Sequence, residues 1–323
     1  MSVQKITVTD DDDGLRLDRW FRARFPQVTH GRLEKLLRKG EIRVDGGRVR
    51  ANLRLEEGMV VRIPPLPPPD HERAVNPISI SPEDVAALQD RVLYRDNSLI
   101  AFDKPPGLAV QGGSGTMRHL DGMLDALQFG APERPRLVHR LDRDTSGVLI
   151  LARTRVAAKA LTTAFAARST EKRYWALVRG VPDPEGRFDS LLRKVAAGGG
   201  REQMASDPEG KTATTFYRCM AHADGAYSWL ELVPLTGRTH QLRVQLAEAG
   251  FPIVGDRRYG GSVAKNKSGL GRGLHLHARE LVIPHPEGGA LGVAASLPRH
   301  MAQSWQTCGW DEPPVAEPGR SPA

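Results

Sequence analysis

The sequence predicts an α+β protein in which a small basic domain precedes a larger mixed domain. The chain has 323 residues, which exceeds the roughly 100 to 200 residues of a typical single domain. Residues 63–77 are too rich in proline to continue a sheet and should form a stiff spacer between two regions. Beyond the spacer, β-rich runs and helical stretches lack the regular order of βαβ units, which favours a mixed α+β domain.

The basic segment has the pattern of a small folded domain, which we bound at residues 14–65. Apolar side chains recur at helical spacing over residues 17–25. Thr29 and Gly40 have the positions of the N-cap and the end of a second helix. Short elements are expected to follow: strands at 42–44, 48–50 and 59–63 and a turn at 45–47.

The net positive charge of the chain comes entirely from one segment of this domain. Between Arg16 and Arg54 there are twelve Lys or Arg and four Asp or Glu, whereas the rest of the chain carries 34 charges of each sign. A segregated surplus is typical of a module that binds a polyanion, although a solvated basic face without a partner is the alternative. The cations expected to make the contacts lie on the second helix or in the strand after it: Arg32, Lys35, Arg38, Lys39 and Arg43.

The second domain is expected at residues 89–312, after a linker at 66–88 and before a disordered tail at 313–323. Its apolar and β-branched runs predict strands at 92–94, 99–103, 148–152, 174–178 and 227–233, the last with alternating faces. Helices are expected at 154–168 and 240–249, the second ended by Gly250.

Composition and hydropathy exclude several classes of protein. The residues are 40% hydrophobic and 26% charged, as is usual for soluble globular proteins. No apolar run approaches the roughly 18 to 20 residues of a membrane helix, and the N-terminus lacks the features of a signal peptide. Cys219 and Cys308 have no C-x-x-C spacing, which disfavours disulfides and cysteine zinc sites. We therefore expect a cytoplasmic protein with no membrane partner.

Common chemical motifs are also absent from the sequence. There is no G-x-x-x-x-G-K-[ST], no G-x-G-x-x-G after a strand, no H-E-x-x-H and no G-x-S-x-G, so nucleotide-driven chemistry and serine hydrolysis lose their main support. His275 and His277 have the spacing of a metal pair, but no carboxylate or cysteine accompanies them at ligand spacing. We expect these histidines to be half-buried neighbours in a strand, and no metal ion.

The densest group of reactive side chains lies at residues 137–147, LVHRLDRDTSG, directly before the apolar run VLILA. Asp142 stands between Arg140 and Arg143 at the mouth of a buried strand, where a carboxylate can be held rigidly as a nucleophile or base. Two alternatives remain open on these residues. Asp142 can form a structural ion pair with either arginine, or act with Asp144 as the carboxylate pair of a glycosidase.

Six motifs, in order, resemble those of the RluA family of pseudouridine synthases. They are KPPG at 104–107, HRLDRDTSG at 139–147, KRYWALVRG at 172–180, KTATT at 211–215, LTGRTHQLRVQL at 235–246 and GDRRYG at 255–260, the last followed by LHLHARELVIPHP. The stretch RLVHRLDRDTSGVL is most similar to the RluC branch, whose members modify large-subunit (23S) ribosomal RNA. The basic domain resembles the αL-type RNA-binding domain that a small-subunit ribosomal protein shares with several RNA-modifying enzymes.

This resemblance implies a fold, a reaction and three catalytic residues. The fold is a catalytic domain with a mixed antiparallel sheet, preceded by the αL domain. The reaction isomerises uridine to pseudouridine in RNA with base flipping, and it needs no cofactor. Asp142 is the implied nucleophile, Arg238 the arginine paired with it, and Tyr174 the aromatic ring that packs on the uracil.

The resemblance also implies substrate contacts. Leu242 corresponds to an apolar wall of the pocket, and Arg140 to the side chain that fills the stack left by the flipped base. Lys104 and His139 lie within the motifs, and we expect both to contact RNA.

The implied partner is 23S ribosomal RNA, and we expect a monomer because no exposed apolar face stands out. Three alternatives remain. The enzyme can belong to a sister branch that acts on another ribosomal RNA helix or on transfer RNA. The chain can instead be a non-catalytic RNA-binding factor for ribosome assembly. A hydrolase of small glycosides is disfavoured by the basic domain and by an aromatic content of only 6%.

Overall fold

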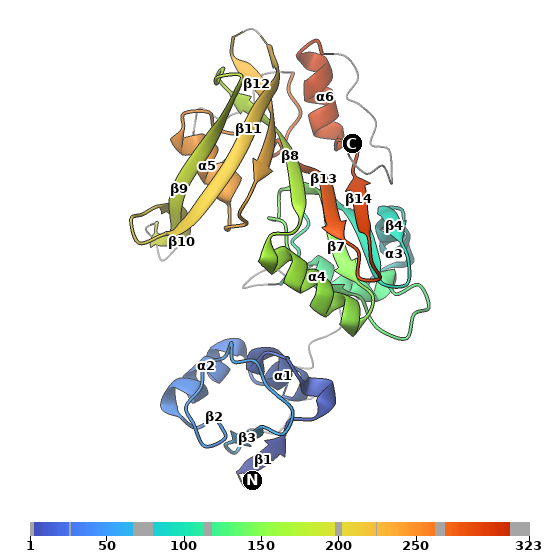
Figure 1. Ribbon diagram of the computed structural model, residues 1–323, viewed down its shortest axis with the longest axis vertical. Helices are drawn as coiled ribbons and strands as arrows, with labels where there is room; N and C mark the ends of the chain where they lie inside the picture. Colours follow the sequence, from blue (N-terminus) through green and yellow to red (C-terminus); the bar gives the residue numbers. More distant parts are fainter. Residues whose placement is uncertain are drawn as a thin grey trace. The chain divides into compact units, whose positions relative to one another are not determined.

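The computed structural model in Figure 1 describes residues 3–25, 27–66, 80–112, 118–197, 202–223, 225–261 and 269–310. The chain divides into two compact units, Met1–Ser79 and Ile80–Ala323. Most of the expected linker and all of the expected tail lie outside the described residues. The last part of the expected linker belongs to the helix α3 (Pro82–Gln89) of the second unit. Within the described residues, no helix is long and apolar enough to span a membrane.

The N-terminal unit contains the two predicted helices, α1 (Leu17–Arg24) and α2 (His30–Lys39). The Thr29 hydroxyl caps α2 by accepting a hydrogen bond from the backbone N–H of Arg32 at 3.4 Å. Gly40 ends α2 in the left-handed conformation, with φ of 73°. Both boundaries of the second helix are thus confirmed.

The small sheet of this unit differs from the prediction in one strand. Its order is β1 (Gln4–Thr7), β3 (Val60–Ile63) and β2 (Arg43–Val44), with antiparallel pairing throughout. The prediction of a strand at residues 48–50 is wrong. One edge of β3 pairs with β2, and the other edge pairs with β1 instead of with residues 48–50. The unit therefore begins before residue 14, where we had placed its boundary.

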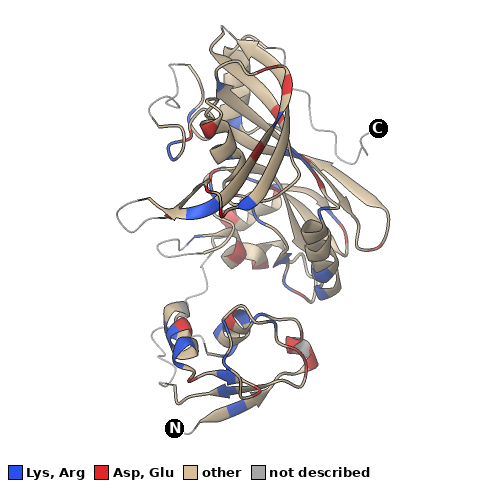
Figure 2. Cartoon of the chain, turned by 60° about the vertical axis from the view of Figure 1, so that its left-hand side comes forward, with Lys and Arg blue, Asp and Glu red and all other residues tan. Residues whose placement is uncertain are grey.

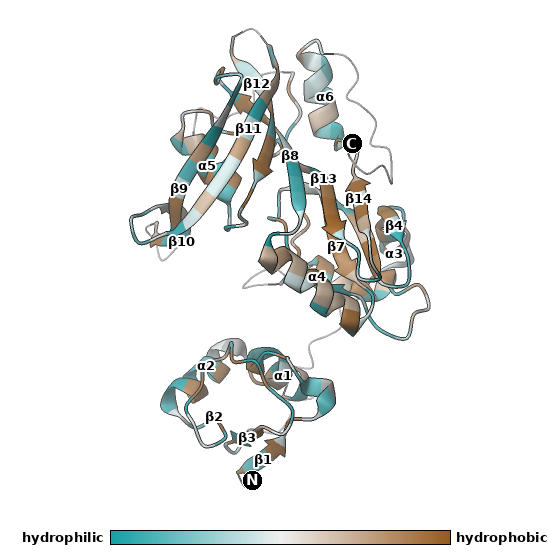
Figure 3. Cartoon of the chain, viewed as in Figure 1, coloured by the Kyte–Doolittle hydropathy of each residue, from teal (hydrophilic) through white to brown (hydrophobic). Residues whose placement is uncertain are grey.

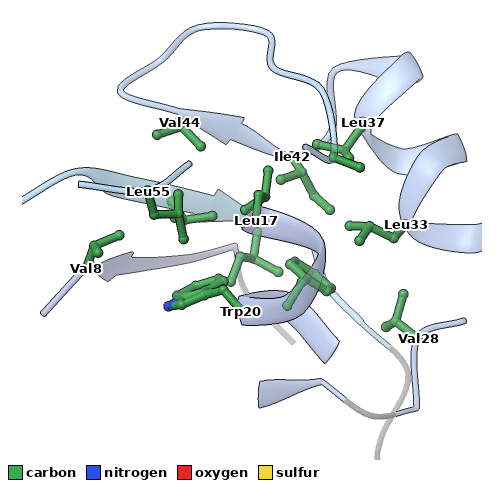
Figure 4. Close-up of a cluster of buried hydrophobic side chains, with 13 residues drawn as sticks. Val8, Leu17, Trp20, Val28, Leu33, Leu37, Ile42, Val44 and Leu55 are labelled. Atoms are coloured by element: carbon green, nitrogen blue, oxygen red, sulfur yellow. The ribbon is translucent and has the colours of Figure 1, made fainter. Parts of the chain in front are cut away.

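One apolar core holds the N-terminal unit together (Figure 4). Trp20 and Leu17 from α1 are fully buried beside Leu33 and Leu37 from α2. The carboxylate of Asp12 accepts the indole N–H of Trp20 at 3.0 Å and also pairs with Arg24 at 2.6 Å. This core leaves the outer face of α2 to its charged residues.

The second unit is built on one large mixed sheet. In the described residues its order is β10-β9-β11-β12-β8-β13-β7-β5-β4, with β14 beside β13 and β6 beside β7. All pairs are antiparallel except β7 with β13. The strands are β4 (Val92–Arg95), β5 (Leu99–Lys104), β6 (Arg136–Leu137), β7 (Ser146–Ala152), β8 (Glu171–Arg179), β9 (Glu185–Ala196), β10 (Glu202–Ser206), β11 (Lys211–Ala223), β12 (Tyr227–Pro234), β13 (Leu276–Pro284) and β14 (Ala290–Ala294).

Helices cover both faces of this sheet. Besides α3, they are η3 (Leu120–Leu127), α4 (Arg155–Ala167), α5 (Gln241–Glu248) and α6 (Arg299–Thr307). Along β12, Trp229 packs in a cluster with Trp305 of α6, whereas Leu230 packs in another with Leu242 of α5. The predicted alternation at residues 227–233 is real, but it separates two buried clusters rather than core from solvent. The central strands β5 and β7 are accordingly buried along most of their length, from Leu99 to Phe102 and from Ser146 to Ala152, and Figure 3 shows β7 as mainly hydrophobic.

The parallel junction of β7 with β13 requires a glycine. Gly147 lies opposite Ala278, has φ of 108°, and a Cβ built on it would overlap the carbonyl of Ala278. Gly147 also pairs with Lys104 at the end of β5. Three strands from distant parts of the chain therefore meet at one residue, just after the loop that carries Asp142.

We predict that Gly147→Ala lowers the free energy of unfolding of the second unit by at least about 3 kcal/mol, because it adds a backbone clash to an unfavourable φ. Thermal unfolding followed by circular dichroism measures the change. Gly237→Ala is the matched control, since a Cβ there meets no atom within 4 Å and should change stability by less than about 1 kcal/mol. Equal stability of the two variants would contradict the prediction.

Candidate active site

Asp142 lies on a short loop that is anchored by the residues that follow it. The carbonyl of Arg143 accepts hydrogen bonds from the Gly107 N–H and from the Lys104 ammonium, each at 2.9 Å. Four residues after Asp142, the Ser146 hydroxyl is hydrogen-bonded to Nδ1 of His277 on β13 at 2.9 Å. The Asp142 side chain is 17% exposed, so its carboxylate is held at a fixed position but can still be reached.

Arg243 of α5 is the arginine beside Asp142. Its Nη1 lies 3.8 Å from Oδ2 of Asp142. The same guanidinium donates two hydrogen bonds of 2.8 Å to the buried carboxylate of Asp256. Its pKa is raised because the hydrogen bond and charge of Asp256, with the charge of Asp142, outweigh the opposing effect of burial. A fixed cation therefore stands between two carboxylates.

The predicted pairing of Asp142 with Arg238 is wrong. Nε of Arg238 donates to the carbonyl of Thr212 at 3.2 Å, and within the described residues Arg238 makes no ion pair with Asp142. Arg238 precedes α5, whereas Arg243 lies inside it, directed by the helix toward the Asp142 loop. Arg238 and Asp142 nevertheless line one small cavity together.

His240 approaches Asp142 from the start of α5. Its Nε2 lies 3.8 Å from Oδ2 of Asp142, and its Nδ1 is hydrogen-bonded to the hydroxyl of Tyr259 at 2.6 Å. Burial lowers the pKa of His240, with Arg243 acting in the same direction and Asp142 opposing it. The residue has φ of 53°, a left-handed conformation that is uncommon outside glycine. Such strain persists only where the surrounding structure fixes it.

A buried amide network fixes this end of α5. The Gln241 side chain accepts the Thr236 hydroxyl at 2.7 Å and donates to the Thr215 hydroxyl at 3.0 Å. Gln245, one turn later, accepts from the same Thr215 at 2.7 Å and donates to Ala213 of β11 at 3.0 Å. Each amide has partners for both its oxygen and its nitrogen, which rigidifies a polar network in a core. The helix that carries Arg243 is thereby attached to β11.

A small cavity of about 100 Å³ opens beside Asp142. Tyr174 on β8, Leu242 on α5 and Leu276 on β13 form apolar parts of its wall, and Arg140 and Arg238 also line it. Burial and the negative charge of Asp142 both raise the pKa of Tyr174, so its phenol remains protonated through the neutral range. Asp142, Tyr174 and Leu242 therefore meet in one cavity, as the motifs led us to expect.

Lys104 does not have the exposed position expected of an RNA contact. Its side chain is fully buried, and its ammonium donates three hydrogen bonds of 2.9 Å to the carbonyls of Pro105, Leu108 and Arg143. Burial lowers its pKa to about 7, against the raising effects of nearby aspartates that include Asp142. Lys104 thus ties the end of β5 to the Asp142 loop.

His139 makes its hydrogen bond and its ring contact inside the second unit. Its Nε2 accepts the backbone N–H of Ile150 in β7 at 2.8 Å, and its ring stacks on Phe165 of α4 at 4.1 Å. Desolvation of the ring, with Lys172 nearby, lowers its pKa to about 3. The neutral ring of His139 thus connects α4 to β7, three residues before Asp142 in the chain.

The predicted contacts on α2 are at the surface. Arg32, Lys35, Arg38 and Lys39 are all exposed, and Figure 2 shows basic residues on the helices of this unit. Arg43 differs, because its guanidinium donates to the carbonyls of Gly40 at 3.1 Å and Gly46 at 3.2 Å. Arg43 therefore braces the turn after β2, whereas the four α2 cations are directed to solvent.

Comparison with known proteins identifies the family. A sequence profile described as RNA pseudouridylate synthase matches residues 98–248. The chain is 38% identical over 308 residues to a Haemophilus influenzae protein named ribosomal large subunit pseudouridine synthase C, covering 93% of each chain. The chain belongs to the RNA pseudouridylate synthase family. An Escherichia coli (strain K12) synthase of the same name is 37% identical over 302 residues, with 89% of this chain and 91% of that protein covered.

Solved structures of this family agree with the fold of the second unit. Human RNA pseudouridylate synthase domain containing 4 matches with a TM-score of 0.60 and 28% identity, over 71% of this chain and 97% of that chain. Human RNA pseudouridylate synthase domain containing 1 gives 0.56 and 27%, over 68% and 87%. The predicted mixed α+β fold of a pseudouridine synthase is thereby confirmed.

Four residues of this synthase site were missed by the sequence analysis: His240, Arg243, Asp256 and Tyr259. All lie in the motifs at 235–246 and 255–260, so they were within the segments that carried the resemblance. His240 and Arg243 are three residues apart, the spacing that places two side chains on one helical face. This spacing could have indicated that Arg243, rather than Arg238, lies on the same side of the helix as His240.

Among the described residues, no group of three or more His, Cys, Asp or Glu side chains is placed to hold a metal ion. His275 and His277 are both buried on or beside β13. His275 is hydrogen-bonded through Nε2 to the Ser304 hydroxyl at 2.7 Å, and His277 through Nδ1 to Ser146 at 2.9 Å. Burial lowers the pKa of each histidine to about 4.

These histidines predict acid sensitivity of folding. Because their folded pKa lies below the unfolded value, their contribution to stability is complete above about pH 6.5 and is lost as the pH falls toward about 4. Together they should add about 2.5 kcal/mol per pH unit to the slope of unfolding free energy near pH 5. Urea unfolding of His277→Gln should show a slope lower by about half of that, and an unchanged slope would contradict the assignment.

Proposed function

We propose that this protein isomerises uridine to pseudouridine in 23S ribosomal RNA, with Asp142 as the catalytic nucleophile. Proteins named ribosomal large subunit pseudouridine synthase C match about nine-tenths of its length at 37–38% identity. The observation that supports the catalytic role best is the placement of Asp142. Its carboxylate lies beside the fixed Arg243 cation and forms one wall of the cavity that Tyr174 also lines.

The reaction requires the protein to position the nucleotide and to supply a charged group beside its ribose. The bond between ribose C1′ and uracil N1 breaks, the freed uracil turns, and C5 of the ring bonds to the same C1′ while its proton moves to N1. Atoms and electrons balance without an oxidant, a reductant or a donated group. A rigid carboxylate next to the ribose and a pocket that retains the uracil are sufficient.

Tyr174 and Leu242 supply the walls that retain the base. A phenol kept protonated by its surroundings packs as a neutral ring, and its hydroxyl can donate a hydrogen bond to a nearby oxygen. Leu242 is only 8% exposed and faces the cavity from α5. The uracil is thereby enclosed between strand β8 and helix α5.

Arg140 assists the extrusion of the base. It is exposed and lines the cavity two residues before Asp142. A planar guanidinium can stack in the place that the uracil leaves, which offsets part of the few kcal/mol that base flipping costs.

The N-terminal unit contributes RNA affinity as an αL-type domain. Its α2 helix buries its apolar side against α1 and the small sheet, and presents Arg32, Lys35 and Arg38 to solvent. Exposed cations on one helix bind phosphates without regard to sequence, so this unit supplies a salt-dependent share of affinity.

We place the enzyme in the cytoplasm as a monomer, where ribosomal RNA is its partner. Large exposed apolar side chains among the described residues are few and come from separate elements, such as Val156 on α4 and Phe216 on β11. Scattered residues of this kind do not make the contiguous apolar patch of a stable interface.

Asp142→Asn should abolish pseudouridine formation and leave RNA affinity within a few-fold, because the amide keeps the shape of the side chain but not its charge. Carbodiimide primer extension on 23S ribosomal RNA measures the product. Asp125→Asn is the control, since this exposed carboxylate of η3 lies outside the cavities around Asp142, and it should retain substantial activity. Activity in Asp142→Asn would refute the mechanism, and an inactive wild-type enzyme would favour a non-catalytic assembly factor.

The double variant Lys35→Gln/Arg38→Gln should weaken binding of 23S ribosomal RNA and reduce the slope of log affinity against log salt by about 1.4 to 2. Both side chains are exposed on α2, so their loss should not disturb the core. Filter binding at several salt concentrations measures the slope. Lys5→Gln on β1 removes an exposed cation away from α2 and should leave it unchanged. If the double variant kept the wild-type slope, α2 would not be the contact.

A further inference from the structure

A second and larger cavity adjoins the catalytic pocket. Its volume is about 890 Å³, and it shares Asp142, His240 and Arg243 with the smaller one. Under the proposed function, on which this inference rests, the uracil enters the small pocket and its ribose lies against Asp142. The strand on at least one side of that ribose must then continue into the second cavity, whose volume lies near the upper end of the roughly 300–1,000 Å³ of ligand pockets.

The second cavity is rich in arginine. Most of its guanidinium groups have protein partners. Arg243 is paired with Asp256, Arg258 donates to the carbonyl of Glu202, and Arg143 donates to the carbonyl of Gly107 at 3.0 Å. Arg257 and Arg272 are different. Both are exposed, and neither has a hydrogen bond or ion pair with another described residue. The guanidinium groups of Arg257 and Arg272 are therefore available to bind a ligand in the second cavity.

The backbone positions of Arg257 and Arg272 are fixed by close packing. A Cβ on Gly255 would overlap the carbonyl of Gly273, so the segments that carry the two arginines are in direct backbone contact. On the Arg257 segment, the Asp256 carboxylate accepts the N–H groups of Arg258 at 2.9 Å and Tyr259 at 3.1 Å.

The segment of Arg272 is held equally closely. A Cβ on Gly271 would overlap the carbonyl of His300, and the Gly271 N–H donates to the Ser304 hydroxyl at 2.9 Å. Rigid backbones that present unpaired cations are typical of built anion sites.

We propose that Arg257 and Arg272 bind backbone phosphates of the RNA strand next to the target uridine. A guanidinium matches two oxygens of one phosphate with two parallel hydrogen bonds, and it does so without reading a base. The target nucleotide is thereby held from both ends, with its base in the small pocket and its phosphodiester link on these arginines. Productive alignment of ribose C1′ with Asp142 depends on both contacts.

The test compares Arg257→Gln/Arg272→Gln with the wild-type full chain. We expect KM for a 23S ribosomal RNA transcript to rise about tenfold, because charged hydrogen bonds are lost. The salt slope of binding to a labelled single-stranded oligouridylate should fall by about 1.4, as for two phosphate contacts. Lys159→Gln is the control, since it removes an exposed cation of α4 that lines neither cavity, and both quantities should stay at wild-type values.

A neutral backbone separates phosphate binding from a structural effect. Oligouridylate with methylphosphonate linkages should bind the wild type more weakly than the natural strand does. That discrimination should be about tenfold smaller in the double variant, because the groups that sense the charge are gone. Equal discrimination by wild type and double variant would overturn the proposal. So would displacement of the oligouridylate by uridine monophosphate at equal phosphate concentration, which would indicate a mononucleotide site.

The outcomes distinguish this inference from the function on which it rests. If the wild type forms pseudouridine and Asp142→Asn does not, but KM and the salt slope of the double variant match the wild type, the phosphate site alone is refuted. If the wild type forms no pseudouridine, the proposed function fails. The oligouridylate measurements then still decide whether the arginines bind phosphate.

Discussion

The buried ion pair of Arg243 with Asp256 is the interaction on which the site depends. Two hydrogen bonds of 2.8 Å fix the guanidinium, and its remaining edge lies 3.8 Å from Asp142. Removing Asp256 would leave a buried cation with one distant partner, which proteins tolerate poorly. The same carboxylate orders the backbone that carries Arg257. A single ion pair thus fixes the guanidinium beside Asp142 and the backbone of the segment that carries Arg257.

Much of the architecture could be predicted, because local patterns determine it. Both helices of the N-terminal unit followed from their apolar spacing, with Thr29 and Gly40 marking the boundaries of the second. The strand β1 was missed because its exposed residues give no alternation that local pattern can detect. The long strands β9 and β11 were missed for a related reason. They lie toward one end of the sheet, between β10 and β12, and many of their residues are exposed and polar.

Single residues were harder to assign than elements. Asp142, Tyr174 and Leu242 were placed in one cavity by motif order, and the structure brings them together there. Lys104 and His139 were assigned to RNA because charged and aromatic groups in a motif suggest contact. The full burial of Lys104 is a property of the folded chain that the motif alone does not reveal. Lys104 holds three carbonyls inside the protein instead of a phosphate outside it.

The hydrogen bond between Ser146 and His277 joins residues 131 positions apart. Pairing over such distances is slow to form and comes late in folding. During synthesis, the loop that bears Asp142 leaves the ribosome long before β13, its parallel neighbour, has been made. The loop therefore cannot gain its anchor on β13 until residues 276–284 have been synthesised. The arrangement around Asp142 is thus completed by one of the last strands to be made, although the loop itself lies near the middle of the chain.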